Sequence, residues 1–308
     1  MRRIRTALLI SFCVASAAFG ETYAERLGWD PKDRVLILHS DDVGMSLANN
    51  RGSAEALEYG LVTSVSVMMP CPWVSDWLAY VKEHPGIDTG LHLTLTSEYD
   101  GYRWPPVAGK PMVPGLADEH GCLPDNVGLV VQNASPDEVE AEIRAQIDRA
   151  QTMGLPITHL DSHMGTLFEP EFLERFVKVG VEMQIPIIMR GARPGQDLSE
   201  FAKKTWDGGL PVLDVVHTAS YNWKTTDLDE KAELYIKAIR NLKPGVTEMI
   251  IHCTKPDDVI GVINGDRDFL YGDYFSMIDD RVKKAIEDEG IILTTWRELK
   301  ERRDRAGK

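Results

Sequence analysis

Short apolar runs alternate with longer amphipathic segments along most of the chain. The short runs are rich in Val, Ile and Leu and are bounded by turn residues, a pattern that is typical of strands buried in a sheet. We expect eight strands, at Val35–His39, Val62–Met69, Thr89–Thr94, Ile157–Asp161, Ile185–Met189, Val212–His217, Thr247–His252 and Ile291–Thr295. Strands that alternate with helices in this way indicate a parallel sheet or barrel.

The amphipathic segments between these strands predict helices. Six are expected, at Ser46–Tyr59, Val74–Glu83, Pro136–Met153, Pro170–Met183, Asp229–Asn241 and Tyr274–Asp288. The third has the clearest start, because the chain from Ser135 to Glu138 reads Ser-Pro-Asp-Glu, a capping box with proline at the first helical position. No internal repeat or linker divides the sequence. The pattern therefore predicts an α/β fold with a single (β/α) barrel-like domain over residues 21–308.

Two stretches interrupt the alternation of strands and helices. Residues 98–134 are rich in proline and glycine, which predicts a long loop inserted over one end of the domain. Such loops often shape a binding cleft, and Tyr102 and Trp104 within it are candidate platforms for stacking on a sugar ring. A second excursion of this kind is expected between Gly191 and Leu210.

The first twenty residues form a compositional class of their own. Arg2, Arg3 and Arg5 precede an apolar run, Ala7 to Phe19, and small residues lead up to Gly20. This arrangement is typical of a secretory signal peptide, and the apolar run is too short for a comfortable membrane span. We therefore expect residues 1–20 to be cleaved and the mature protein to be periplasmic or secreted, with no membrane attachment after cleavage.

The charge of the mature chain limits its partners. Loss of the three N-terminal arginines leaves 31 basic residues against 48 acidic ones, a net charge of −17. Nucleic acids and anionic membranes require clustered Lys and Arg, so neither is an expected partner, and a small neutral or cationic substrate fits better. Homo-oligomerisation stays open. The mature chain holds three cysteines without a CxxC motif, which allow at most one disulfide: Cys71, Cys122 and Cys253.

Acidic residues and histidines recur where the predicted strands end. Loops that follow the carboxyl ends of strands in a parallel barrel converge on one pocket, so residues at these ends are expected to meet. The residues concerned are Asp41, Asp42, His92, His159, Asp161, His163, His217 and His252. Two imidazoles and one carboxylate from three strands can hold a divalent cation and leave positions open for water and substrate.

The adjacent carboxylates Asp41 and Asp42 repel each other unless solvent or a cation offsets their charge. One of them can ligate a cation while its neighbour takes a proton from water. Asp161 is interpreted as a carboxylate that orients a neighbouring imidazole, and His159 as a satisfied interior residue. By simple alternation His39 is expected to face away from the neighbours of Asp41, and it is interpreted as structural.

Five segments of the chain resemble the YdjC-like carbohydrate deacetylases, a family whose type activity is on chitooligosaccharides. They read LILHSDDVGMSLANNRGSAEALEYGLVTSVSVMM, IDTGLHLTL, THLDSH, TEMIIHC and GIILTTWREL. The resemblance implies a (β/α)-type barrel, often irregular, with an Asp-His-His site for magnesium or zinc. It implies that Asp42, His92 and His163 are the metal ligands. It also implies that Asp41 is the catalytic base and that His252 is a general acid or stabilises the transition state.

The chain departs from the family pattern in two places. The family usually continues Asp-Ser-His with further histidines, whereas this chain reads Asp161-Ser-His-Met-Gly-Thr166. This change alters the pocket wall, so the substrate can differ from a chitooligosaccharide. The corresponding family histidine is followed by Pro-Gly, whereas His252 is followed by Cys-Thr-Lys-Pro, which changes its surroundings.

The hypothesis that follows is an exported, metal-dependent hydrolase that removes an acetyl group from an N-acetylated sugar or oligosaccharide. One alternative is hydrolysis of an ester, a different amide or a phosphate ester. Few cationic groups are expected near the site, only Arg190 and Lys255, which disfavours a phosphate ester. The other alternative is a noncatalytic carbohydrate-binding barrel that has lost its chemistry.

Overall fold

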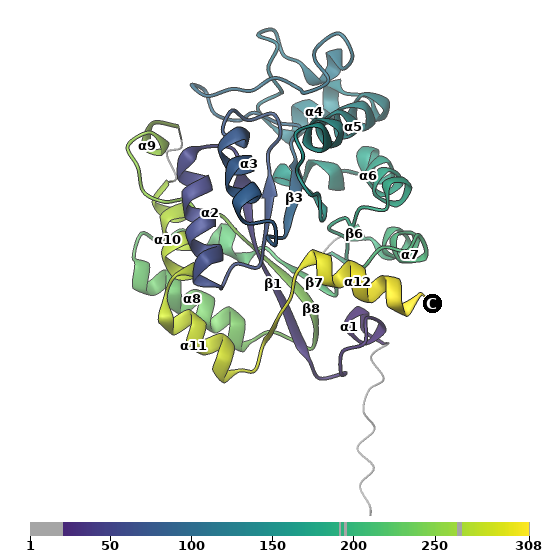
Figure 1. Cartoon of the computed structure of the whole chain (residues 1–308). Helices are drawn as coiled ribbons and strands as arrows, with labels where there is room; N and C mark the ends of the chain where they lie inside the picture. Colours follow the sequence, from purple (N-terminus) through teal and green to yellow (C-terminus); the bar gives the residue numbers. More distant parts are fainter. Residues whose placement is uncertain (1–20, 191, 194–195, 264–266, 308) are drawn as a thin grey trace, which may run out of the picture.

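The computed structural model describes residues 21–190, 192–193, 196–263 and 267–307. The predicted signal peptide, residues 1–20, lies outside this part of the chain. A curled sheet of parallel strands lies at the centre and helices surround it (Figure 1). The strands of this sheet are β1 Arg34–Val43, β2 Ser64–Val67, β3 Thr89–Leu93, β4 Leu160–Ser162, β7 Val215–His217, β8 Gly245–Ile251 and β9 Ile292–Leu293.

The order of the strands is β4-β3-β2-β1-β8-β7, and β9 pairs with the start of β1. Every pair of named strands in this sheet is parallel, so their carboxyl ends lie at one pole. The predicted strand Ile185–Met189 is wrong as a regular strand, because only an isolated bridge joins Ile187 to Leu160. Pro186 lacks an N–H and cannot donate to a ladder, which is one physical reason. The predicted α/β barrel-like fold is therefore confirmed in an irregular form, curled rather than evenly closed.

The helices agree with the sequence pattern in most places. They are α1 Tyr23–Arg26, α2 Leu47–Tyr59, α3 Val74–Glu83, α4 Val127–Asn133, α5 Pro136–Thr152, α6 Pro170–Met183, α7 Ser199–Asp207, α8 Leu228–Arg240, α9 Ile260–Ile263, α10 Arg267–Met277, α11 Asp280–Asp288 and α12 Trp296–Ala306. The capping box at the start of α5 is confirmed, since Ser135 and Glu138 each accept a hydrogen bond from the other's backbone N–H. The single helix predicted at Tyr274–Asp288 is wrong. Asp279 interrupts it and caps α11 by accepting a hydrogen bond from the Arg281 N–H.

The inserted loop after β3 is largely irregular, as predicted, and holds only α4 and a 3₁₀ turn, η1, at Pro114–Leu116. The loop is nevertheless well packed. The backbone N–H groups of Val107 and Ala108 in this loop both donate to the carboxylate of Glu142 on α5, at 2.8 Å. Trp104 is 2% exposed and its Nε1–H donates to the Thr96 carbonyl. Trp104 is therefore part of the core and not a sugar platform. Tyr102 is also tied down, by its O–H to the Met45 carbonyl.

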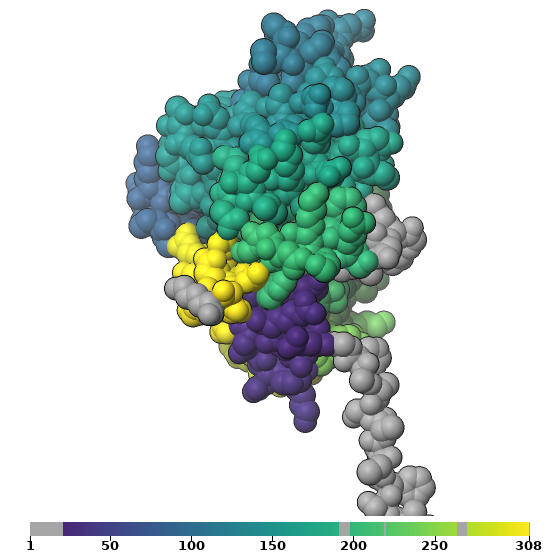
Figure 2. Space-filling model, turned by 90° about the vertical axis from the view of Figure 1, so that its right-hand side faces the viewer, coloured from purple at the N-terminus to yellow at the C-terminus, as the bar shows by residue number. Residues whose placement is uncertain are grey.

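Further short elements follow the strands β4 and β7 and occupy the second predicted excursion. They are the 3₁₀ turns η2 His163–Phe168 and η3 Ala219–Asn222 and the hairpin of β5 Ala192–Arg193 with β6 Gln196–Asp197. At the opposite pole of the barrel, the segment after α1 and helix α12 lie side by side (Figures 1 and 2). There the guanidinium of Arg302 lies 3.9 Å from the ring centre of Trp29. The described cysteines are all free thiols.

Among the residues that the structure describes, no helix combines the length and the apolar composition that crossing a bilayer requires.

Candidate metal centre

The acidic pair occupies an irregular part of β1, near its carboxyl end. Successive side chains of a regular strand face opposite sides, so Asp41 and Asp42 would be separated. Here the register with β2 shifts between Ser40 and Val43, and Asp42 has the left-handed φ of 62°. Such a backbone costs roughly 1–3 kcal/mol for a residue other than glycine, and this strain tends to occur at functional sites. Both carboxylates end up buried at the same pole of the barrel.

Asp42, His92 and His163 are brought together from three separate segments. Asp42 Oδ1 lies 3.4 Å from His92 Nε2 and 3.3 Å from His163 Nδ1. Three potential ligand atoms of these residues lie within 4.8 Å of one another. Ligands about 2.1 Å from a tetrahedral cation are separated by about 3.4 Å, so the spacing suits such an ion.

The hydrogen bonding of this group also fits a cation. Asp42 Oδ1 is buried and accepts no hydrogen bond, although buried carboxylate oxygens normally have a partner. A divalent cation between Asp42, His92 and His163 would satisfy this oxygen and the two imidazole nitrogens together. The donor set, two nitrogens and one carboxylate, is one that zinc and related divalent ions accept.

A second carboxylate holds the far side of each candidate histidine ligand. Asp161 Oδ1 makes a short contact with His92 Nδ1, and Glu98 Oε1 lies 3.0 Å from His163 Nε2. Carboxylates in this position fix the tautomer and the orientation of a metal-binding imidazole. The orienting role expected for Asp161 agrees with this geometry. Glu98 was missed, because it belongs to the inserted loop and nothing in the sequence showed which strand end that loop would reach.

Charge within the cluster favours ionised carboxylates and protonated histidines in the metal-free protein. Burial opposes ionisation of Asp42, but contacts with His163 and the neighbouring imidazoles hold the pKa of Asp42 below its ordinary value. Burial also lowers the pKa of His163, yet Glu98 and Asp42 outweigh it and raise that pKa well above its usual range. Metal binding requires neutral imidazoles, so a cation entering this site would displace protons.

His39 lies two residues before Asp41 on β1 and shares a face with it, which agrees with the alternation expected there. His39 Nε2 lies 3.0 Å from Asp41 Oδ1 and 3.0 Å from Asp161 Oδ2. The ring is fully buried, and its Nδ1 lies 3.1 Å from the Ser64 hydroxyl.

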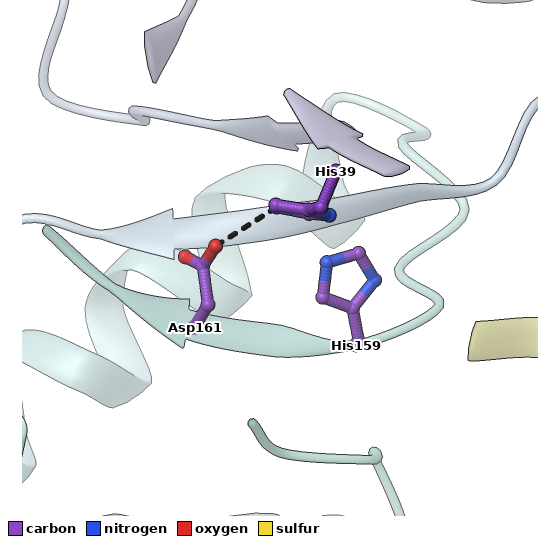
Figure 3. A group of neighbouring side chains, drawn as sticks. All are labelled: His39, His159 and Asp161. Atoms are coloured by element: carbon purple, nitrogen blue, oxygen red, sulfur yellow. Dashed lines mark hydrogen bonds and ion pairs between the residues drawn. The ribbon is translucent and has the colours of Figure 1, made fainter. Parts of the chain in front are cut away.

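His39 belongs to a group that we call the buried polar layer, which lies inside the barrel next to the acidic pair. Its members are His39, Ser64, Ser66, Asp161 and Glu248. Figure 3 shows His39 joined to Asp161 and His159 projecting toward the same space from the segment before β4. His39, His159 and Asp161 could in principle hold a cation. Both His39 nitrogens already have protein partners, however, so hydrogen bonding accounts for this group.

His159 is an interior residue, as predicted, but it is only partly satisfied, because its Nε2 is buried without a hydrogen-bond partner. Its Nδ1 lies 3.0 Å from the Thr158 hydroxyl, and its ring stacks on Trp296 with the centres 5.3 Å apart. Gly90 lies against the other side of the ring, where an added Cβ would come within 2.4 Å of it. The sequence requires glycine at this position because the ring fills the space that a side chain would need.

Asp41 and His252, the predicted catalytic pair, lie at the edge of the ligand cluster. Asp41 Oδ2 is 3.8 Å from His92 Nε2 and 4.0 Å from His252 Nε2. His252 follows β8, and its backbone N–H donates to Asp273 at 3.1 Å. Burial lowers the pKa of His252, but Asp273 and the nearby acidic pair raise it above its ordinary value. Asp273 was missed, because it lies on α10 and reaches His252 only through the fold.

A cavity of about 380 Å³ opens beside the cluster. Asp41, His92 and Asp161 contribute to its wall, together with Arg190, Tyr221 and several apolar residues that include Phe168, Ile188, Val216 and Ile250. A cavity of this size, apolar with a few convergent polar groups, is typical of a small-molecule site. His217 belongs to none of the potential metal-binding groups of the described residues, and its ring lies 5.9 Å from that of Trp223.

The pH dependence of stability tests the buried polar layer, because the pKa of Glu248 is shifted. Burial raises the pKa of Glu248 to about 7, while His39 and the Trp296 N–H act in the opposite direction. The raised pKa means that the folded protein binds a proton more tightly than the unfolded chain does. This stabilisation is complete below pH 4.5 and is lost as the pH rises through about 7.

Glu248→Gln is therefore expected to gain stability relative to the wild type as the pH rises. The advantage of the variant should grow by about 2 kcal/mol between pH 5 and pH 8, because the amide keeps the Trp296 hydrogen bond and never ionises. Urea unfolding of both proteins at the two pH values measures this difference. An advantage that stays constant with pH would show that Glu248 does not titrate with a raised pKa.

The chain is similar to known carbohydrate deacetylases over nearly its whole length. It is 31% identical over 284 residues to the carbohydrate deacetylase of Thermus thermophilus, covering 90% of this chain and 97% of that protein. It is 32% identical over 270 residues to the carbohydrate deacetylase of Geobacillus stearothermophilus, covering 86% and 98%. The chitooligosaccharide deacetylase of Serratia marcescens matches at 32% over 144 residues, which is 45% of this chain and 53% of that one.

The fold has a solved counterpart. The crystal structure of an Enterococcus faecalis protein, a candidate for cellobiose-phosphate cleavage, superposes with a TM-score of 0.74. The two are 23% identical, with 87% of this chain and 99% of the other covered, so the likeness concerns the fold alone. The sequence pattern of the family described as YdjC-like protein matches residues 35–288. The chain thus belongs to the YdjC-like family of carbohydrate deacetylases.

Proposed function

We propose that this protein is an exported, metal-dependent hydrolase that removes the acetyl group from an N-acetylated sugar or oligosaccharide. The observation that carries the proposal is the buried Asp42 Oδ1, which lacks a hydrogen bond and faces His92 Nε2 and His163 Nδ1 at 3.3–3.4 Å. The candidate base Asp41 and the candidate acid His252 lie next to this cluster. Metal-assisted hydrolysis of an amide needs a metal site, a general base and a general acid in one place.

Each residue has a defined task in this proposal. A bound divalent cation supplies Lewis acidity, which polarises the acetyl carbonyl and makes a nearby water more acidic. Asp41 accepts the proton of that water as it attacks the carbonyl carbon, since its Oδ2 faces the cluster. His252 then donates its proton to the amine as the C–N bond breaks, and its raised pKa keeps that proton available. Acetate and a free amino sugar are the products.

The proposed substrate class is supported by the relatives and by the cavity. Proteins named as carbohydrate deacetylases match this chain over 86–90% of its length. The cavity of about 380 Å³ is large enough for one sugar ring with its acetamido group. Export is supported by the sequence pattern of residues 1–20.

Acetate release from a panel of acyl compounds tests the proposal. N-acetyl sugars and N-acetyl oligosaccharides should release acetate, and a chelator should abolish the release because the chain alone cannot polarise the carbonyl. Return of zinc or magnesium should restore it, and elemental analysis of the purified protein should find a divalent metal. An O-acetyl ester and a phosphate ester belong in the panel, because turnover of either one alone would replace the proposed reaction.

The same protein preparation tests export and the noncatalytic alternative. Protein recovered from the periplasm or medium should lack residues 1–20, which mass spectrometry shows directly. Sugar binding with no metal and no turnover would instead support a noncatalytic carbohydrate-binding barrel.

A further inference from the structure

We infer that His39 is a positioning residue for hydrolysis, which holds Asp41 and Asp161 in fixed positions relative to each other through its Nε2–H. The inference rests on the proposed function, because Asp41 is the base of that reaction. His39 itself lies too deep to touch substrate, since its ring is fully buried and contributes nothing to the cavity wall. It would act only through the carboxylates that it contacts.

The contacts of His39 fix the ring completely. Its Nδ1 lies 3.1 Å from the Ser64 hydroxyl and 3.6 Å from Glu248 Oε1. Its Nε2 lies 3.0 Å from Asp41 Oδ1, from Asp161 Oδ2 and from the Ser66 hydroxyl. One N–H group thus faces two carboxylates, which would otherwise repel each other in a buried space.

The contact with His39 determines which oxygen Asp41 presents to the reaction. Asp41 Oδ1 is buried and has no hydrogen bond of good geometry, so its stabilisation depends on the electrostatic contact with His39. Oδ2 is then left facing His92 Nε2 at 3.8 Å and His252 Nε2 at 4.0 Å. Without the His39 N–H, nothing described near Oδ1 opposes rotation of the Asp41 carboxylate away from the cluster.

The effect on the metal ligands should be smaller than the effect on the base. Asp161 orients His92 through Oδ1, and its Oδ2 accepts hydrogen bonds from both His39 and Ser66. The Ser66 hydroxyl, 2.8 Å from Asp161 Oδ2, should still donate to this oxygen when His39 is replaced, although it loses its own 3.0 Å contact with His39 Nε2. Loss of His39 should therefore reduce turnover while metal binding is largely kept, a separation that a general folding defect would not produce.

Two substitutions of His39 test this separation. His39→Gln keeps an N–H donor at similar reach, whereas His39→Leu fills the space without a donor. We expect kcat to fall about 10-fold in His39→Gln and about 100-fold in His39→Leu, because misplacing a catalytic group by about 1 Å can cost that much. KM should change less than about twofold, and elemental analysis should find metal at the wild-type level in both variants.

His159→Asn provides the matched control. His159 is a fully buried histidine beside His39, but its hydrogen bond goes to Thr158 and it holds no catalytic carboxylate. This variant is expected to lose stability in urea unfolding and to keep kcat within about threefold of the wild type. An equal loss of kcat in His159→Asn and His39→Leu would overturn the inference, since any disturbance of the interior would then suffice.

Other outcomes of these measurements also decide whether His39 is a positioning residue. Wild-type kcat in both His39→Gln and His39→Leu would reject the positioning role. Equal losses of kcat in these two variants, accompanied by loss of bound metal, would reject it as well. If His39→Leu does not fold, the kcat and metal content of His39→Gln decide alone.

A crystal structure of a metal-free His39 variant provides a readout that is independent of activity. Its Asp41 carboxylate should be turned away from His92, and an unchanged Asp41 would contradict the inference. If the wild-type protein releases no acetate, the proposed function fails, whereas the orientation of Asp41 in the variant still tests the role of His39.

Discussion

Asp41→Asn is expected to lower kcat for acetate release by about 10³-fold and to leave the metal content unchanged. The amide cannot accept a proton from the attacking water, and general-base catalysis contributes roughly 10²–10⁴-fold to such reactions. Metal should remain, because the cation would be held by Asp42, His92 and His163 and not by Asp41. Steady-state acetate release and elemental analysis of the same preparation provide the two measurements.

The control for this substitution is Asp137→Asn. Asp137 is an exposed residue of α5, its side chain pairs with Arg175, and neither residue lines the cavity. This variant should show wild-type kcat and metal content. Wild-type acetate release by Asp41→Asn protein would show that Asp41 is not the base. The inference that His39 positions this base would then fail too.

Asp42→Ala is expected to weaken metal binding by more than about 100-fold and to reduce turnover to background. Loss of a carboxylate that merely orients a ligand typically costs 10–100-fold in metal affinity, and direct loss of a ligand should cost more. The substitution also leaves His92 Nε2 and His163 Nδ1 without the anion that lies 3.3–3.4 Å from them. Competition with a chromophoric chelator measures the affinity, and excess zinc should restore only part of the activity.

His84→Ala serves as the matched control for the metal site. His84 is an exposed histidine that follows α3, and it belongs to none of the potential metal-binding groups of the described residues. Its removal should not change metal affinity or turnover. Unchanged metal affinity in Asp42→Ala would mean that the cation, if one binds, uses a different set of residues, such as Asp41, His92 and Asp161.

The fold could be predicted where local signals were unambiguous. Helix α5 begins at a capping box, and α3 and α6 have the bounds that their apolar periodicity indicated. Prediction failed where one residue changed the local backbone. Pro186 prevents a regular strand near Ile187, and Asp279 divides a helical segment into α10 and α11. Neither effect alters the hydrophobic pattern, which is why the pattern alone did not reveal it.

Only those residues of the candidate site that lie at strand ends could be predicted from the sequence. Residues at the carboxyl ends of parallel strands meet by topology, so the acids and histidines at these ends could be grouped before their distances were known. The resemblance to the YdjC-like family then singled out Asp42, His92 and His163 as the ligand set. The residues that support them come from other kinds of element. Glu98 lies in the inserted loop and Asp273 on α10, and their contacts with His163 and His252 depend on the complete tertiary structure.

The position of Trp296 links the order of synthesis to the completion of the site. Its indole N–H donates to Glu248 at 2.8 Å, its ring stacks on His159, and its backbone N–H donates to Asp88. Residue 296 follows β1, β3, β4 and β8 along the chain, so the interior around His39 is closed on the side of Trp296 only after all of these strands have been synthesised. The packing beside the candidate cation-binding pole is therefore completed by a segment that is made later than every candidate ligand.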